Sequence, residues 1–274
     1  MSTYSTRDRA VFAAVRGGIV MFLLGMIGVV ALAVYTVPSL RELPELATFS
    51  YPMLLVLAAA NSTVLLAVFV LLGTATAPKI GLQSHIYAWA ANRDPEWEEL
   101  AGSVTIAVVF GVGIFILIMI IDVLFAPFVR LDAGAVPSDS DPLLALAASI
   151  PMRLLYGGIT EEILLRWGVM APVAWVLWRL KARSGTVTET PSAKTMWIAI
   201  VFSAVLFGLG HLPALAASFE LTPILIVRTV VLNAIAGIGF GWLFWRRSLE
   251  AAMIAHATFH VALVAVSTVL LLVS

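Results

Sequence analysis

The sequence predicts an all-α polytopic membrane protein with about seven transmembrane helices. Of its 274 residues, 61% are hydrophobic and only 12% are charged, whereas a soluble domain carries roughly 25% charged residues. Apolar runs of about 20 residues, the length that crosses a bilayer as a helix, recur along the whole chain. The charges that interrupt these runs gather mainly in the C-terminal half, which indicates a polar site inside the membrane.

Seven runs are predicted to span the bilayer, and the fourth is unusual. The runs cover residues 11–37, 51–77, 102–127, 142–180, 195–212, 223–245 and 249–273. The fourth is too long for one straight crossing and contains Pro151, Pro172 and the pair Gly157-Gly158. We therefore expect an interfacial or tilted helix that leads into a spanning helix. If this run crosses twice, the chain has an eighth span.

Lys and Arg residues outside the runs or near their ends divide unevenly between alternate segments. With a cytoplasmic N-terminus, eleven of them, including Arg16 and Arg179 near the ends of their runs, lie on the inner side and two on the outer side. The positive-inside rule therefore favours seven spans with the N-terminus in the cytoplasm. Splitting the fourth run would move the basic loop 179–194 to the outside, which counts against an eighth span. We expect an integral protein of the plasma (inner) membrane, surrounded by the lipid bilayer.

Composition also excludes several classes of function. The formal net charge is zero, so we expect no nucleic-acid partner. The absence of cysteine excludes disulfides, thiolate zinc sites and a cysteine nucleophile. The segment 78–100 mixes aromatic and charged residues, so we expect it to lie along the membrane interface. His85 in this segment is expected to be an exposed loop histidine.

The fourth run contains two adjacent carboxylates, Glu161 and Glu162, and the cation Arg166. A charge at membrane depth costs roughly a few kcal/mol unless it is paired or faces a polar cavity. On a helix, Glu162 and Arg166 stand at i,i+4 with the acid N-terminal, which favours an ion pair. Glu161 points about 100° away and has no local cation. It is therefore a candidate general base or acid.

Three of the four histidines lie in later runs, at His211, His256 and His260. His256 and His260 are four residues apart, so both rings should face the same side of the last helix. Together with the acidic pair, the three histidines predict one common site. Arg228, Asn233 and Asp122 lack such spacing and are expected to pack or to form an ion pair.

The three motifs together, in this order, resemble the CPBP family of type II CAAX proteases and bacteriocin-processing (Abi) proteins. The motifs are EEILLR at 161–166, FGLGH at 207–211 and HATFH at 256–260. The family pattern is EExxxR, then FxxxH, then a histidine followed four residues later by Asn or Asp. This chain departs from that pattern at the last position, where it has His260. The resemblance divides the chain into a three-helix N-terminal membrane region, 1–141, and a catalytic membrane domain of the later helices, 142–274.

The resemblance implies an intramembrane endopeptidase that cuts a membrane-associated protein or peptide. In the family, the residue at Glu161 activates a water molecule with the help of the residue at His211. Those at Glu162 and Arg166 brace the helix. His256 and His260 would stabilise the oxyanion, since a neutral imidazole can still donate one hydrogen bond. This version needs no cofactor.

Two alternatives remain open. In the first, Zn²⁺ is held by His211, His256 and His260, with a glutamate as base or fourth ligand, because His260 completes an i,i+4 histidine pair. In the second, the protein is a non-proteolytic transporter or scaffold homologue. The chain has no internal repeat of the kind that many transporters contain, which counts against a transporter.

Overall fold

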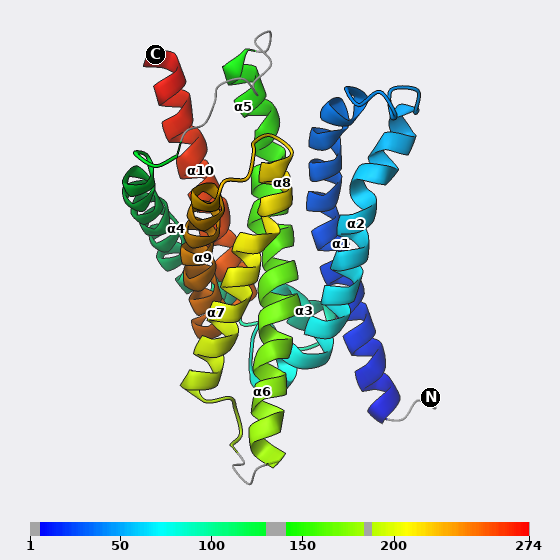
Figure 1. Ribbon diagram of the computed structural model, residues 1–274. Helices are drawn as coiled ribbons and strands as arrows, with labels where there is room; N and C mark the ends of the chain where they lie inside the picture. Colours follow the sequence, from blue (N-terminus) through cyan, green and yellow to red (C-terminus); the bar gives the residue numbers. More distant parts are fainter. Residues whose placement is uncertain (1–5, 130–140, 184–187, 274) are drawn as a thin grey trace.

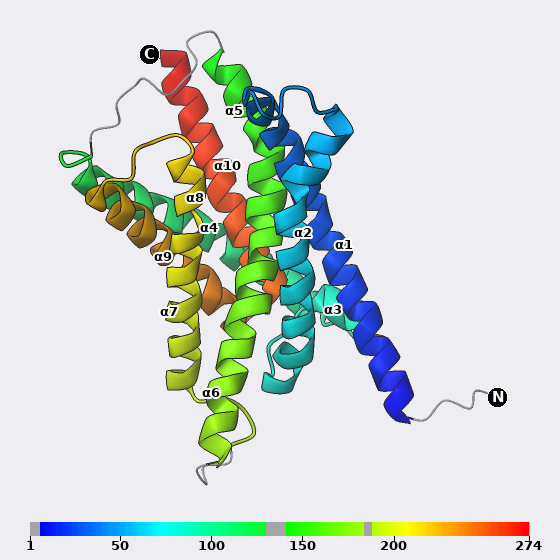
Figure 2. The same ribbon diagram turned by 45° about the vertical axis from the view of Figure 1, so that its right-hand side comes forward.

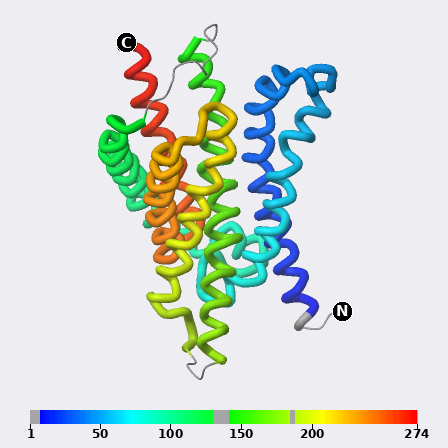
Figure 3. Tube along the Cα trace, viewed as in Figure 1, coloured from blue at the N-terminus to red at the C-terminus, as the bar shows by residue number. Residues whose placement is uncertain are grey.

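The computed structural model describes residues 6–129, 141–183 and 188–273. Within these ranges the regular structure is helical throughout, and seven helices are long and apolar enough to cross a membrane (Figure 1). The two termini lie at opposite ends of the bundle (Figure 3), as an odd number of crossings requires. The predicted fold class is therefore confirmed, and the chain is an integral membrane protein.

The helices follow the predicted runs closely. Their bounds are α1 Thr6–Arg41, α2 Tyr51–Thr76, η1 Ala77–Ile80, α3 His85–Ala90, α4 Trp97–Phe125, α5 Pro142–Pro151, η3 Met152–Thr160, η4 Ile163–Met170, α6 Ala171–Arg183, α7 Ala193–Gly210, α8 Leu212–Ala216, α9 Pro223–Arg246 and α10 Leu249–Val273. Polar residues just before several helices accept a hydrogen bond from the first turn, as Asp141, Ser192 and Thr222 do. Such caps satisfy backbone donors that the helix itself leaves unpaired.

The fourth run forms one continuous helix, Pro142–Arg183, so the predicted break into an interfacial and a spanning helix is wrong. The helix stays continuous because its turns widen after Pro151, where η3 and η4 are π-helical. The N–H of Glu161, for example, bonds to the carbonyl of Tyr156 five residues earlier. This helix runs through the middle of the bundle and contacts α1, α2, α7 and α10 (Figure 1).

The segment between α2 and α4 packs partly against the protein, so the prediction that His85 is an exposed loop residue is wrong. Its predicted place along the membrane interface stays a prediction. Tyr87 is 3% exposed, and His85, expected to be an exposed loop residue, is 4% exposed. The reason is a set of bonds to the start of α10. Glu250 accepts hydrogen bonds from Ser84 Oγ at 2.6 Å and from the N–H of Ile86 at 3.0 Å. In Figures 1 and 2, α3 lies against α1 near the level where α10 begins.

Two further contacts fix the later helices. Arg228 on α9 forms a bidentate ion pair with Asp122 on α4, with N–O distances of 2.6 and 2.8 Å. An ion pair was one of the two predicted roles of these residues. On α9, a Cβ added at Gly237 would come within 2.8 Å of Ala204 on α7. The absence of a side chain at residue 237 therefore lets α7 and α9 pack closely.

Candidate active site

The predicted site residues come from three helices that meet at one cavity. The cavity has a volume of about 800 Å³, and Glu161, His211, His256 and His260 all line it. Glu161 lies between η3 and η4 on the central helix, His211 directly follows α7, and the other two histidines lie on α10. They reach the same depth because α10 begins about half-way up the bundle (Figure 2).

Glu162 and Arg166 lie beside this cavity, in the protein interior. One carboxylate oxygen of Glu162 is 2.8 Å from His256 Nδ1, and the other is 3.1 Å from Arg166 Nε. The predicted i,i+4 ion pair is thus present, and both side chains are at most 1% exposed. A buried charge is tolerated only when it is well paired. Glu162 meets this condition by contacting both the guanidinium and the imidazole.

The environment of Arg166 explains one motif residue outside the charged cluster. The guanidinium lies 4.9 Å from the ring centre of Phe207 and 5.5 Å from that of Phe240. It also donates a hydrogen bond to the carbonyl of Gly237 at 3.2 Å. Cation–π contacts of this kind are strongest away from water. Phe207, the first residue of FGLGH, therefore helps to hold the cation that pairs with Glu162.

Hydrogen bonds set the orientation of two histidine rings. His211 Nδ1 is 2.8 Å from the carbonyl oxygen of Phe207, which can only accept, so this nitrogen carries a proton. His256 Nδ1 makes the corresponding bond to the carboxylate of Glu162. In the neutral rings, Nε2 of both histidines then carries the lone pair. Nε2 of His256 lies 4.0 Å from a carboxylate oxygen of Glu161.

His260 stacks on His256, with ring centres 4.9 Å apart, so the predicted shared face of the last helix is confirmed. Its Nδ1 is buried and has no hydrogen-bond partner among the described residues. On the other side, a Cβ added at Gly157 would lie 2.6 Å from His260 Nε2. The imidazole therefore occupies space that exists because residue 157 is glycine.

The ring orientations of His211 and His256 suit metal ligands, because ligating histidines donate their other N–H to a carbonyl or carboxylate. Across residues 6–129, 141–183 and 188–273, however, no three His, Asp or Glu side chains gather closely enough to hold a metal ion. The geometry thus supplies suitable donors without a formed three-ligand set.

The cavity also contains polar residues that sequence reasoning did not assign to it. Arg153 and Asn61 line the cavity together with Tyr156 and Asn233. None of them belongs to a motif. For Arg153, the available signal was its position two to three helical turns before Glu161 on the same helix.

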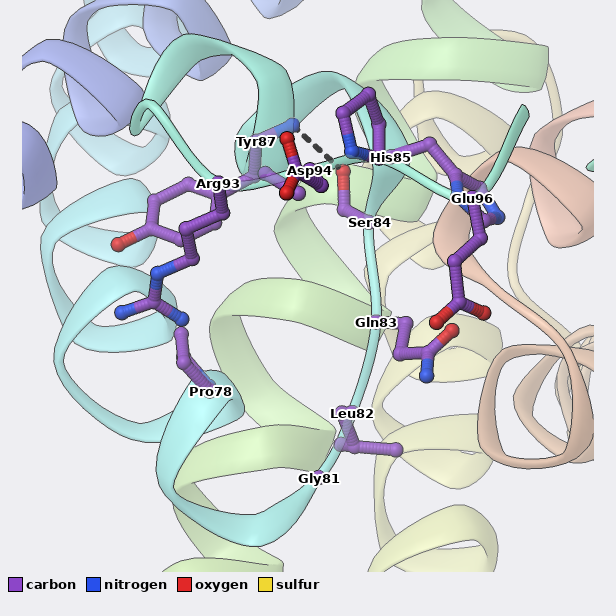
Figure 4. Close-up of a pocket in the computed structure, with 12 residues that line it drawn as sticks. Pro78, Gly81, Leu82, Gln83, Ser84, His85, Tyr87, Arg93, Asp94 and Glu96 are labelled. Atoms are coloured by element: carbon purple, nitrogen blue, oxygen red, sulfur yellow. Dashed lines mark hydrogen bonds between the residues drawn. The ribbon is translucent and has the colours of Figure 1, made fainter.

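A second, smaller cavity of about 230 Å³ lies on the segment between α2 and α4 (Figure 4). Its polar lining includes Arg93, Asp94 and Glu96. Burial raises the pKa of the Tyr87 phenol, which also borders it, although the charge of Arg93 opposes this shift. None of the predicted site residues lies there.

Comparison with known proteins identifies the family. Residues 143–262 match the family model described as "Type II CAAX prenyl endopeptidase Rce1-like". Searches of curated proteins and of solved structures gave no match. The matched range contains the complete set of predicted site residues, Glu161, Glu162, Arg166, His211, His256 and His260. Over residues 143–262, the chain is therefore a membrane protein with a domain of the CPBP/CAAX protease type, a family of endopeptidases.

Proposed function

We propose that this protein hydrolyses a peptide bond of a membrane-associated protein or peptide with water activated by Glu161, without a metal ion. The observation that carries the proposal is the difference between the two adjacent glutamates. Glu162 is fully buried and held by Arg166 and His256. Glu161 lines the cavity with 17% of its side chain exposed, and it makes no ion pair with Lys or Arg among the described residues. Its carboxylate is therefore available to a water molecule.

In the proposed reaction, the water donates one hydrogen bond to Glu161 and the other to Nε2 of His211. This orientation directs the oxygen lone pair at the scissile carbonyl carbon. Glu161 takes a proton as the carbon–oxygen bond forms, and gives it to the amide nitrogen as the carbon–nitrogen bond breaks. The bond from His211 Nδ1 to Phe207 supports this role, because it leaves Nε2 free to accept.

His256 and His260 are proposed to stabilise the oxyanion of the tetrahedral intermediate. His256 already shares its Nδ1 proton with Glu162, so it can donate from Nε2 only as an imidazolium. We therefore assign Glu162 and Arg166 the role of holding His256 in place for this donation.

The zinc alternative uses the same cavity. His211, His256 and His260 would hold the ion, which would supply a Lewis acid and a bound water of lowered pKa. The test is His260→Asn, measured for peptidase activity and for zinc content after purification. The metal-free reaction predicts that the variant keeps most of its activity, because a carboxamide also donates a hydrogen bond, and that chelators have no effect. Stoichiometric zinc lost together with activity would establish the alternative.

The main experiment measures cleavage of membrane-anchored peptides by the purified protein in liposomes. Replacing Glu161 with Gln should lower the rate by about 100-fold or more, the usual contribution of a general base. The unfolding midpoint in detergent should stay unchanged. Full activity of Glu161→Gln would overturn the mechanism. A wild-type protein that cleaves nothing would favour the transporter or scaffold homologue.

We further propose that the protein lies in the plasma (inner) membrane with its N-terminus in the cytoplasm. The distribution of Lys and Arg supports this orientation, because they are concentrated in the segments on the side of the N-terminus. The substrate would then be a membrane-anchored protein or peptide that reaches the cavity from the bilayer or its surface.

A further inference from the structure

The cavity carries one cation whose role no motif explains. Besides the histidines, the described residues that line the cavity include one basic side chain, Arg153, and one carboxyl group, Glu161. Arg153 lies on η3, on the same central helix as Glu161. It lies at a depth where an arginine side chain is expected to have a partner.

Two other arginines inside the spans have an acidic partner, and Arg153 has none among the described residues. Arg166 pairs with Glu162, and Arg228 pairs with Asp122. The Nε of Arg153 donates to the hydroxyl of Ser149 at 2.9 Å. Within the described ranges, its two terminal nitrogens have neither a hydrogen bond nor an ion pair. A guanidinium left open in this way offers two parallel N–H groups, the arrangement that binds a carboxylate.

The separation between Arg153 and Glu161 gives the expected position of that carboxylate. Eight residues of α-helix correspond to roughly 12 Å at 1.5 Å per residue, and the π-helical turns of η3 rise less, so the separation is at most about 12 Å. An extended peptide covers about 3.3–3.6 Å per residue. An extended substrate whose scissile bond lies at Glu161 would therefore reach Arg153 within three or four residues of that bond.

We propose that Arg153 is a specificity-determining residue that binds a carboxylate of the substrate three or four residues from the bond that is cut. The carboxylate is either the C-terminus of the peptide or an Asp or Glu side chain. This inference rests on the proposed function, because the distance is measured from Glu161.

The test compares membrane-anchored peptides that differ in a single carboxylate. One pair ends in a free carboxylate or an amide three or four residues after the cleaved bond. A second pair has the amide end with Asp or Asn at that position. For at least one pair, the kcat/KM of the wild type should be about tenfold or more higher for the carboxylate peptide than for its neutral partner. The difference should lie mainly in KM, and its size is that expected from one charge-assisted hydrogen bond. Which pair responds identifies the source of the carboxylate.

Variants then assign the preference to Arg153. Arg153→Gln should remove it, and Arg153→Lys should retain part of it, because a lysine supplies the charge without the paired geometry. The matched control is the double variant Arg228→Gln and Asp122→Asn, which neutralises an intramembrane arginine that does not line the cavity. This control should keep the full preference.

A binding experiment separates this inference from the proposed catalysis. The Glu161→Gln protein should bind the preferred carboxylate peptide more tightly than its neutral partner, and addition of Arg153→Gln should abolish the difference. Equal binding of both members of both pairs would overturn the carboxylate site and leave Arg153 as a solvated side chain. Tighter binding of the carboxylate peptide, combined with no cleavage by wild type, would overturn the catalytic proposal alone.

Discussion

Glu161 and Glu162 are adjacent in the chain, yet their surroundings differ completely. Glu162 is fully buried and contacts both Arg166 and His256, whereas Glu161 borders the cavity. A charge that loses its buried partner costs far more than one that faces water. The same substitution, glutamate to glutamine, should therefore affect a different property of the protein at each of the two positions.

Glu162→Gln should lower the free energy of unfolding by about 3 kcal/mol, because the buried charge of Arg166 then lacks its counter-ion. Glu161→Gln should change it by less than about 0.5 kcal/mol. Chemical unfolding in detergent micelles measures both. The double variant Glu162→Gln and Arg166→Met should recover part of the loss, since it removes both charges. Equal stability of the two single variants would contradict this division.

Gly157 and His260 should depend on each other. In Gly157→Ala the new methyl group would lie 2.6 Å from His260 Nε2, so the ring must move. Displacement of a site residue by about 1 Å costs up to roughly 100-fold in rate, and we expect at least a tenfold loss in kcat. With His260→Asn the side chain is smaller, so the added methyl should cost much less. Kinetics of the two single variants and the double variant measure this coupling. Additive losses would show that the contact has no effect on catalysis.

The central helix and the segment before α4 show how tertiary contacts override local pattern. The central helix stays unbroken past Pro151 because its turns widen. The segment before α4 packs against the protein because Ser84 and Ile86 bond to Glu250, about 165 residues later in the chain. α10, which carries His256 and His260, thus begins on this segment.

Glu250→Ala should therefore affect both stability and activity. The variant leaves the Ser84 hydroxyl and the Ile86 N–H without their acceptor in the interior, at a cost of about 2–4 kcal/mol. Glu250→Gln retains an acceptor oxygen and should be milder. Unfolding measurements and hydrogen exchange at residues 84–90 test this, and the exchange should accelerate only in the alanine variant. Unchanged exchange in Glu250→Ala would mean that other contacts hold the segment.

The seven spans and the ion pair of Glu162 with Arg166 were predictable, because apolar run length and i,i+4 spacing are local properties of the sequence. The shared face of His256 and His260 was predictable for the same reason. The buried position of His85 was not, since it depends on bonds to a distant helix. The place of Arg153 in the cavity was missed because hydropathy reports how apolar a run is, not which side chains share a cavity.

The positions of the termini and of the cavity together define an orientation that can be tested. The cavity is lined by Tyr35 and Thr36 near the end of α1 and by Pro213 on α8, in the half of the bundle away from the N-terminus (Figure 1). With the N-terminus in the cytoplasm, as proposed, this half faces outward. Access to Glu161 would then come from the outer side of the membrane.

Single cysteines can test this orientation, because the natural chain has none. Ser50→Cys, before α2, should react with a membrane-impermeant maleimide in intact cells. Glu189→Cys, before α7, should react only after the cells are permeabilised. Both positions are exposed, and Ser50 makes no side-chain capping bond. The reverse pattern would place the N-terminus outside and turn the cavity toward the cytoplasm.

The segment between α2 and α4 contributes to an aromatic layer that bears on the permeability of the membrane. A water-accessible cavity lined by a carboxylate and imidazoles would conduct ions if it were open at both ends. Below the site, Tyr87 packs against Trp167, and Trp167 against Phe244, with ring centres 5.1 and 6.3 Å apart and each side chain at most 3% exposed. We expect this aromatic layer to close the cavity on the side nearer the N-terminus. A closed end would let the protein hold water at membrane depth without conducting protons or ions across the membrane.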